Sequence, residues 1–243
     1  LFPGVRALAE ADPEAILAAW SGLGYYRRAR HLHAAARAIV ARHGGQVPLD
    51  LLSLRALPGI GDYTAAAIAS IAGGRPHAAV DGNGLRIARR LAARPLTLPQ
   101  ARQFWQAALS RRSPGNFNQA LMDLGSLVCL PQAPRCPRCP LRALCRTRGA
   151  GPSAPRPAAQ AVTEHYGLAR RHGRVWLVQR PAHARQLAGL WELPPASPQA
   201  PLLATFRHTI TTRRITAHVR LFRHPAGDGQ WMGSRALPAV SMI

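Results

Sequence analysis

All four cysteines of the chain lie close together near its middle, and no other feature limits the fold as strongly. They are Cys129, Cys136, Cys139 and Cys145, in the spacing C-x6-C-x2-C-x5-C. Thiolates gathered this closely can wrap one metal centre, either zinc or an iron–sulfur cube. No cysteine is left over for a disulfide, so the spacing predicts a metal centre in this segment.

Only one pair of these cysteines has the spacing that is usual in zinc sites. Zinc sites commonly combine two C-x2-4-C knuckles, whereas Cys136 and Cys139 form the single such pair here. A redox-active disulfide would need that pair alone, and no thioredoxin-like strand precedes it. The cysteine spacing alone is therefore compatible with either a zinc or an iron–sulfur centre, and it argues against a redox disulfide.

The charge of the chain favours a polyanionic partner. The formal net charge is +22, from 32 basic and 10 acidic side chains, and every basic side chain is an arginine. Guanidinium groups are planar, permanently charged forks that suit phosphate, so we expect nucleic acid binding with a strong salt dependence. An unspecialised basic surface is the alternative. No apolar run reaches transmembrane length, and no basic amphipathic helix with a bulky apolar face stands out, so we expect no membrane partner.

The chain contains two successive regions that differ in composition and in the pattern of apolar residues. Residues 1–150 are rich in alanine and leucine between Gly and Pro turn signals, which predicts helices, one of them over 28–42. Residues 146–160 are rich in Pro, Ala and Gly and are expected to be a linker. Apolar and polar residues then alternate over 215–222, which predicts a strand. We therefore expect a helical region followed by a second region that contains a β-sheet.

Two short motifs in the helical region carry candidate chemistry. Gly59 and Gly61 flank one aliphatic residue and make a tight turn before a helix N-terminus, an arrangement suited to binding phosphate. Asp81 precedes a helix expected over 85–91. Each motif has a purely structural interpretation, because such turns commonly connect helices and an aspartate before a helix is commonly a cap.

Taken together, the longer strings around these residues resemble one enzyme group. The strings Leu57–Ala65 and Val80–Asn83, with the cysteine spacing, resemble the helix-hairpin-helix, iron–sulfur DNA glycosylases. The strings Trp20–Arg30 and Phe117–Ala120 resemble the adenine-specific branch, the adenine DNA glycosylases. The resemblance implies a multidomain fold: an all-α helix-hairpin-helix glycosylase domain with a [4Fe-4S] cluster loop, followed by an α+β Nudix-like domain.

The resemblance also implies domain boundaries along the chain. Residues 1–95 would form a partial six-helix barrel with the hairpin, and residues 96–145 the iron–sulfur domain. Residues 146–160 would be the linker, and residues 161–243 the Nudix-like module that recognises the lesion. The four cysteines would hold the [4Fe-4S] cluster, which we expect to be structural and to position DNA.

Three residues are the implied catalytic group. In the family, the aspartate that matches Asp81 stabilises the oxocarbenium-like sugar as the glycosidic bond breaks, and Asn83 orients it. Tyr63 stands where lyase-type relatives hold a lysine. A Schiff base needs an amine, and the chain has no lysine, so a lysine-based lyase acting on oxidised pyrimidines is excluded.

Four further positions are implied to contact DNA in the helical region. Tyr25 would wedge into the base stack and lower the cost of extruding a base. Gln119 would read the extruded adenine through its amide. Gly59 and Gly61 would grip phosphate at the hairpin without reading sequence.

The second region resembles the family's Nudix-like module at Gly189–Pro194 and Phe206–Thr209. The acidic residues after residue 160 are Glu164, Glu192 and Asp228. These are too few for the glutamate-rich helix of a working Nudix hydrolase, so we expect recognition of 8-oxoguanine rather than hydrolysis. His208 and the hydroxyl of Thr211 are the candidates, although the family's Phe-Ser-His turn is replaced by Ile-Thr-Thr at 210–212.

The expected activity is therefore monofunctional removal of adenine from double-stranded DNA, opposite 8-oxoguanine or guanine, in base-excision repair. We expect a monomer in a bacterial cytoplasm, associated with the nucleoid when bound to DNA. Leu1-Phe2-Pro3 matches a point after the family's general-acid glutamate, so the chain is expected to lack that group. The alternative is a catalytically impaired protein that binds the mispair without cutting.

Overall fold

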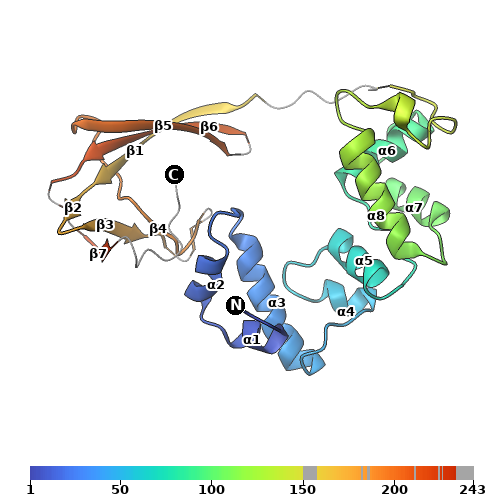
Figure 1. Cartoon of the computed structure of the whole chain (residues 1–243), viewed down its shortest axis with the longest axis horizontal. Helices are drawn as coiled ribbons and strands as arrows, with labels where there is room; N and C mark the ends of the chain where they lie inside the picture. Colours follow the sequence, from blue (N-terminus) through green and yellow to red (C-terminus); the bar gives the residue numbers. More distant parts are fainter. Residues whose placement is uncertain are drawn as a thin grey trace. The chain divides into compact units, whose positions relative to one another are not determined.

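The structure is a computed structural model of the whole chain (Figure 1). It describes residues 1–149, 158–181, 183–184, 187–210, 212–223, 225 and 227–233. Contacts divide the chain into two compact units. One unit comprises Leu1–His33 together with Arg156–Ile243, and the other comprises Ala34–Pro155. Each unit is described by itself below.

Helices make up the first region, as the sequence predicts. They are α1 (Val5–Glu10), α2 (Pro13–Ala19), α3 (Arg27–His43), α4 (Leu51–Arg55), α5 (Asp62–Ile71), α6 (Gly82–Ala92), α7 (Leu98–Ala108) and α8 (Pro114–Asp123), followed by the π-helix η1 (Leu124–Val128) and the 3-10 turn η2 (Cys136–Arg138). The side chains of Asp12 and Asp50 accept hydrogen bonds from backbone N–H groups and cap α2 and α4. Of the expected linker, residues 150–157 lie outside the described residues.

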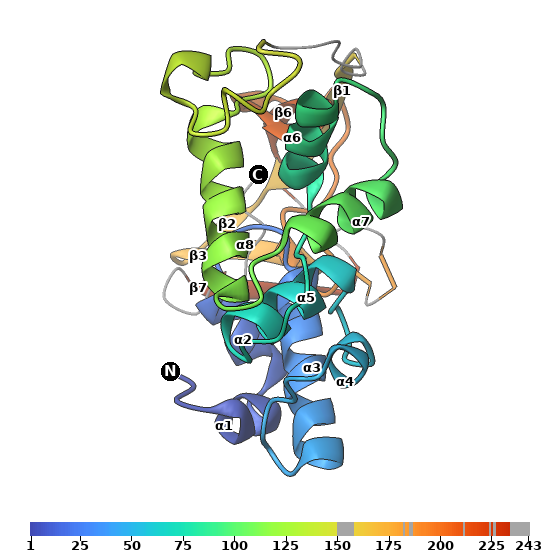
Figure 2. The same ribbon diagram turned by 90° about the vertical axis from the view of Figure 1, so that its right-hand side faces the viewer.

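The core of the unit Ala34–Pro155 lies among α6, α7 and α8 (Figures 1 and 2). Trp105 of α7 is buried and donates from its indole nitrogen to the backbone oxygen of Gly84 in α6, at 2.9 Å. A Cβ atom at Gly84 would lie 3.0 Å from Cγ1 of Val80 and 3.7 Å from the Trp105 indole nitrogen. The glycine therefore leaves room for the Val80 side chain against the first turn of α6, whereas the 3.7 Å contact with the indole would be an ordinary one.

Asn118 of α8 is a buried polar residue at the centre of this unit. Its side chain is 0% exposed and accepts from the backbone N–H of Ala79 at 3.0 Å. The same amide donates to the hydroxyl of Ser70 and to the backbone oxygen of His77, both at 2.8 Å. These bonds tie α8 and α5 to the segment that leads into α6.

Replacing Asn118 with alanine is expected to lower the free energy of unfolding by about 3 kcal/mol, because buried backbone groups would lose their partner. Urea denaturation followed by circular dichroism measures this loss. The matched control is Gln119→Ala on the exposed side of the same helix, which should change stability by less than about 0.5 kcal/mol. Equal losses for the two variants would contradict the structural role of Asn118.

The second region forms two β-sheets, which confirms the expected sheet. The strands are β1 (Gln160–Leu168), β2 (Arg170–Arg171), β3 (Arg174–Gln179), β4 (Trp191–Glu192), β5 (Leu202–Ile210), β6 (Arg213–Leu221) and β7 (Gly229–Gly233). One sheet has the order β1-β6-β5, in which β1 is parallel and β5 antiparallel to β6. The other has the order β2-β3-β4, with β7 also paired to β3. Ile215, Ala217 and Val219 of β6 are buried, which matches the predicted alternation.

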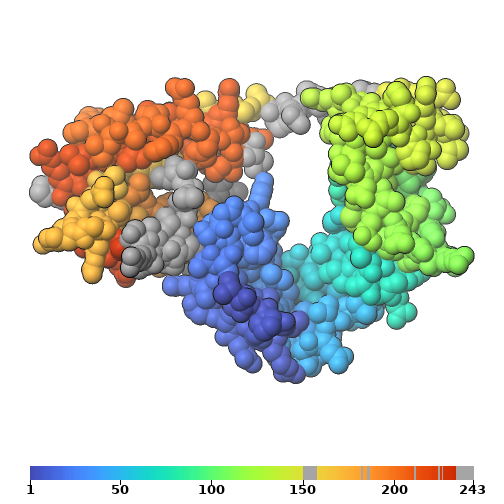
Figure 3. Space-filling view, viewed as in Figure 1, coloured from blue at the N-terminus to red at the C-terminus, as the bar shows by residue number. Residues whose placement is uncertain are grey.

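Residues 1–33 belong to the same compact unit as these sheets. Its helical core consists of Ile16, Leu17, Tyr26 and Ala29, and it also contains Leu190 from the loop before β4. Figure 3 shows the surface of the first helices in dark blue. In the part of the chain that the structure describes, none of the helices combines the length and apolarity needed to span a bilayer.

Candidate active site and cysteine-lined cavity

The turn between α4 and α5 has the geometry expected of the hairpin. Gly59 has a φ of +76°, in the left-handed region that favours glycine. Gly61 is the N-cap of α5, and no side chain caps that end of the helix. The first backbone N–H groups of α5 are therefore not occupied by a capping side chain, as an anion site requires.

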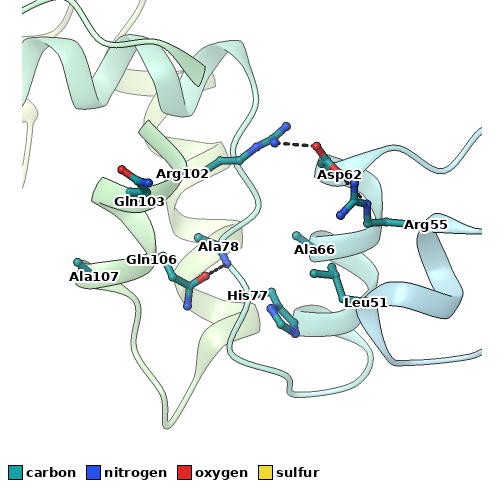
Figure 4. A pocket seen from close by; sticks show the side chains of 10 residues that line it. All are labelled: Leu51, Arg55, Asp62, Ala66, His77, Ala78, Arg102, Gln103, Gln106 and Ala107. Atoms are coloured by element: carbon teal, nitrogen blue, oxygen red, sulfur yellow. Dashed lines mark hydrogen bonds and ion pairs between the residues drawn. The ribbon is translucent and has the colours of Figure 1, made fainter. Parts of the chain in front are cut away.

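Asp62, the first residue of α5, lies between two arginines beside this turn (Figure 4). Its carboxylate pairs with Nε of Arg55 at 2.8 Å and with Nη1 of Arg102 at 2.7 Å. The three side chains line an open cavity of about 740 Å³ between α4, α5 and α7. The two ion pairs thus join both sides of this cavity.

Replacing Asp62 with asparagine is expected to lower the free energy of unfolding by only about 1 kcal/mol. The carboxylate is 38% exposed, so water and salt screen both pairs. Thermal unfolding at low and high salt measures the effect, which should shrink as salt rises. Asp123→Asn, on an exposed part of α8, is the control and should show no such salt dependence. A salt-independent loss would contradict the ion-pair explanation.

Asp81 is the N-cap of α6, and both of its carboxylate oxygens are engaged. Oδ1 accepts from the backbone N–H groups of Asn83 at 2.8 Å and of Gly84 at 2.9 Å. Oδ2 accepts from the side-chain amide of Asn83 at 3.0 Å. The carboxylate is half-buried and fixed in one orientation at the positive end of the helix. The capping role and a catalytic role are thus compatible in the same residue.

Tyr63 lies close enough to Asp81 for the two groups to affect each other. Burial raises the pKa of the Tyr63 phenol, and the negative charge of Asp81 raises it further. The phenol therefore stays protonated and neutral beside the carboxylate. The two residues come from different helices, α5 and α6, and the fold brings them together.

A close approach joins the Asp81 helix to the π-helix that precedes the first cysteine. A Cβ atom at Gly125 would lie 2.6 Å from Cβ of Asn83, so only glycine fits there. Arg86 of α6 donates to the backbone oxygen of Gly125 at 2.7 Å and to that of Cys129 at 2.9 Å. Neither Gly125 nor Arg86 stands in a recognisable local motif, so neither position could be predicted from the sequence.

The four cysteines line one small cavity of about 30 Å³, together with Arg90 and Arg142. Arg90 is 6% exposed and donates to Sγ of Cys129 at 3.2 Å. It also donates to the backbone oxygens of Leu130 at 2.7 Å and Pro131 at 2.8 Å. A buried arginine thus holds the start of the cysteine loop against α6.

The chemistry of this cavity fits the expected cofactor. Of the side chains that line it, the four cysteine thiols are the potential metal ligands. Four thiols are the donor set of a zinc or an iron–sulfur centre. Among the residues that the structure describes, no group of three or more His, Cys, Asp or Glu side chains is arranged closely enough to hold a metal ion. The metal centre therefore stays a prediction that rests on the shared cavity.

Tyr25 occupies an exposed, strained turn between α2 and α3. It has a φ of +49° and is 72% exposed. The turn is held by Trp20, whose indole nitrogen donates to the backbone oxygen of Gly24 at 2.9 Å. The guanidinium of Arg28 lies 5.4 Å from the Trp20 ring and 5.5 Å from the Tyr25 ring. Tyr25 is thus presented outward, as a wedge would have to be.

The remaining candidate DNA-contacting residues are Gln119, His208 and Thr211. Gln119 is exposed on α8 and donates within its own helix to the backbone oxygen of Gly115 at 3.4 Å. His208 lies in β5, half-buried, opposite the buried Ile215. Its ring atom Nδ1 is buried without a hydrogen-bond partner in the described structure. Thr211 lies outside the described residues, so its predicted contact with the lesion stays a prediction.

Comparisons with known proteins define the class to which this fold and site belong. Residues 1–108 match the family model described as HhH-GPD superfamily base excision DNA repair protein. The chain is similar to a thermostable thymine-DNA glycosylase, with a TM-score of 0.56, 26% identity, and coverage of 60% of this chain and 70% of that one. Endonuclease III in a non-covalent DNA complex has a TM-score of 0.55 at 26% identity over the same shares.

The curated relatives narrow this class to one family. The adenine DNA glycosylase of Mycolicibacterium smegmatis is 36% identical over 204 residues, which cover 80% of this chain and 69% of that protein. The human adenine DNA glycosylase is 44% identical over 154 residues, which cover 60% of this chain. The chain belongs to the adenine DNA glycosylase family. It spans 28% of the length of the human relative and 34% of the length of the rat one.

Proposed function

We propose that this protein removes adenine from a mispair with 8-oxoguanine or guanine in double-stranded DNA by hydrolysing the N-glycosidic bond. The observation that carries the proposal is the half-buried Asp81 carboxylate, fixed at the start of α6 and near enough to Tyr63 for its charge to help raise the pKa of that phenol. Membership of the adenine DNA glycosylase family supports the same activity.

Asp81 would act through its charge. As the glycosidic bond breaks, positive charge develops on the sugar, and a fixed carboxylate beside it lowers the energy of that state. Asn83 keeps the carboxylate in place through its side-chain amide, at 3.0 Å. The Tyr63 phenol would offer a neutral hydroxyl beside the sugar without adding charge.

DNA would be held and opened by residues outside this group. The uncapped start of α5, after Gly59 and Gly61, would bind backbone phosphate. Tyr25 would enter the base stack from its exposed turn, and Gln119 would read the adenine edge with its amide. The net charge of +22 would supply the general attraction to DNA.

Cys129, Cys136, Cys139 and Cys145 would hold a [4Fe-4S] cluster, for which Arg90 and Arg142 provide nearby positive charge. When bound, the cluster would supply iron–thiolate bonds that cross-link the loop. Arg86 and Arg90 tie that loop to α6, so the ordered loop would in turn support the helix that carries Asp81.

The second region would be the Nudix-like module over 161–243, joined by a linker over 146–160 to the iron–sulfur domain over 96–145 and the barrel domain over 1–95. We propose that it recognises the oxidised guanine opposite adenine, with His208 and Thr211 as candidate contacts. We also propose a monomer that acts in the bacterial cytoplasm.

A single-turnover assay on a duplex with one 8-oxoguanine:adenine pair tests the function, with binding to the same duplex measured in parallel. A matched duplex with thymine opposite adenine is the control. Lesion-selective binding with an abasic product is the expected result. Selective binding without product would support the second candidate, a protein that recognises the mispair without cutting it. Absence of any selectivity would refute both.

A further inference from the structure

Leu190 joins the second region to the helices that present Tyr25. Its side chain is 0% exposed and belongs to the same core cluster as Ile16 and Leu17 of α2 and Tyr26, the residue before α3. β4 begins at the next residue, Trp191. An aliphatic side chain from the sheet region is therefore buried within a core that is otherwise helical.

A polar contact reinforces this packing. The guanidinium of Arg30 in α3 donates to the backbone oxygen of Ala188, two residues before Leu190. Leu190 and Arg30 thus fasten the same loop to the same pair of helices, one by apolar burial and the other by a charged donor.

The loop is rigidly attached to the sheets behind it. The backbone N–H of Arg180, just after the end of β3, donates to the Leu190 oxygen at 2.9 Å, and the N–H of Gly189 donates to the Arg180 oxygen at 2.9 Å. Trp191 then pairs with Gln179 of β3. Further on, the oxygen of Pro194 accepts from Gly167 of β1 at 2.7 Å. The segment that starts at Leu190 is therefore hydrogen-bonded to both sheets.

On the helical side, the Leu190 contact lies one residue from Tyr25. Tyr26 is 8% exposed and packs in the core with Leu190, whereas Tyr25 is 72% exposed and has a φ of +49°. A turn in this conformation persists only where its surroundings fix it. Loss of the Leu190 contact would free Tyr26, and with it the backbone that aims Tyr25.

We propose that Leu190, with the Arg30–Ala188 hydrogen bond, is a positioning contact through which the second region sets the conformation of the Tyr25 turn. This inference rests on the proposed function, because it assumes that Tyr25 opens the base stack. The contact would keep Tyr25 in the conformation needed for that step. Leu190 does not touch the substrate in this proposal; it acts through Tyr26.

The first test needs no DNA. Amide hydrogen exchange over residues 16–30 is expected to be at least tenfold faster in Leu190→Ala than in the parent protein. Leu190→Met, which keeps most of the volume, should restore the parent rate. Leu202→Ala, the same change at a 53% exposed leucine of β5, is the matched control and should leave the exchange unchanged. Parent-like exchange in a folded Leu190→Ala protein would overturn the proposal.

The second test measures stack opening, by the fluorescence of 2-aminopurine placed at the target base opposite 8-oxoguanine. Leu190→Ala is expected to weaken the fluorescence rise at least tenfold on an intact duplex. On a duplex whose base stack is already opened by an abasic gap beside the target, the fluorescence rise with Leu190→Ala should equal that with the parent protein. A loss of equal size on both duplexes would indicate a general structural defect and overturn the proposal.

Arg30→Ala keeps the test decisive if Leu190→Ala fails to fold. It should reproduce the faster exchange at 16–30, whereas Arg27→Ala, which removes an exposed charge from the same helix, should not. If the parent protein shows no lesion-dependent fluorescence, the proposed function fails, while the exchange measurement still decides whether the contact sets the turn.

Discussion

Replacing Asp81 with asparagine is expected to lower the single-turnover rate of adenine release by about 10²–10³-fold, while binding to the 8-oxoguanine:adenine duplex is retained. Asparagine caps helices as well as aspartate does, so the hydrogen bonds to Asn83 and Gly84 at the start of α6 can be kept. The change therefore removes the charge and the acceptor of the Asn83 side-chain amide, while the cap of α6 is kept. Quenched-flow experiments measure the rate at which abasic product forms. Fluorescence anisotropy measures binding to the duplex.

Asp50 provides the control for this experiment. It caps α4 with a hydrogen bond of 2.8 Å from the Ser53 N–H, as Asp81 caps α6, but it lies outside the proposed site. Asp50→Asn should leave both the rate and the binding at parent values. If Asp81→Asn released adenine at the parent rate, the assignment of Asp81 as the charge that stabilises the sugar would be wrong.

The local structure around Asp81 could be predicted from the sequence because it depends on neighbouring residues. An aspartate before a helix predicts a cap, and the carboxylate does accept from the N–H groups of Asn83 and Gly84. The same reasoning explains the helix over 27–43 and the alternating strand β6. In each case the signal and the structure lie within one short window of sequence.

The contacts that place Asp81 relative to the cysteines could not be predicted in this way. Arg86 and Arg90 resemble solvent-exposed helical arginines in sequence, yet both reach backbone oxygens about 40 positions later in the chain. Asn118 stands next to a candidate base-reading residue but is itself the buried one. Such roles are set by long-range packing, which a single sequence does not display.

The grouping of the first helices shows the same limit. By composition, residues 1–33 belong to the helical region. Contacts nevertheless place them in one compact unit with the sheets. Leu190, an ordinary leucine in a loop, is buried in the same core cluster as Tyr26 and Ala29. The domain boundaries inferred from the family resemblance stay a prediction.

Arg90 provides the second large expected effect. Replacing it with methionine, which keeps the length but removes every donor, is expected to lower the free energy of unfolding by about 3 kcal/mol. The backbone oxygens of Leu130 and Pro131 would lose a charged donor, and Sγ of Cys129 would lose its only cation at 3.2 Å among the described contacts. Iron and sulfide content should fall in parallel, because the loop that would hold the cluster would no longer be fixed to α6.

The control for this experiment is Arg94→Met, which removes the same charge from an exposed position just beyond the end of α6. It should leave both stability and iron content at parent values. A stable Arg90→Met protein with full iron content would show that the cysteine loop folds without this contact. A protein that loses stability but keeps its iron would separate the two roles, and would confine Arg90 to packing against α6. The paired measurement is therefore required, since stability alone does not report on the cluster.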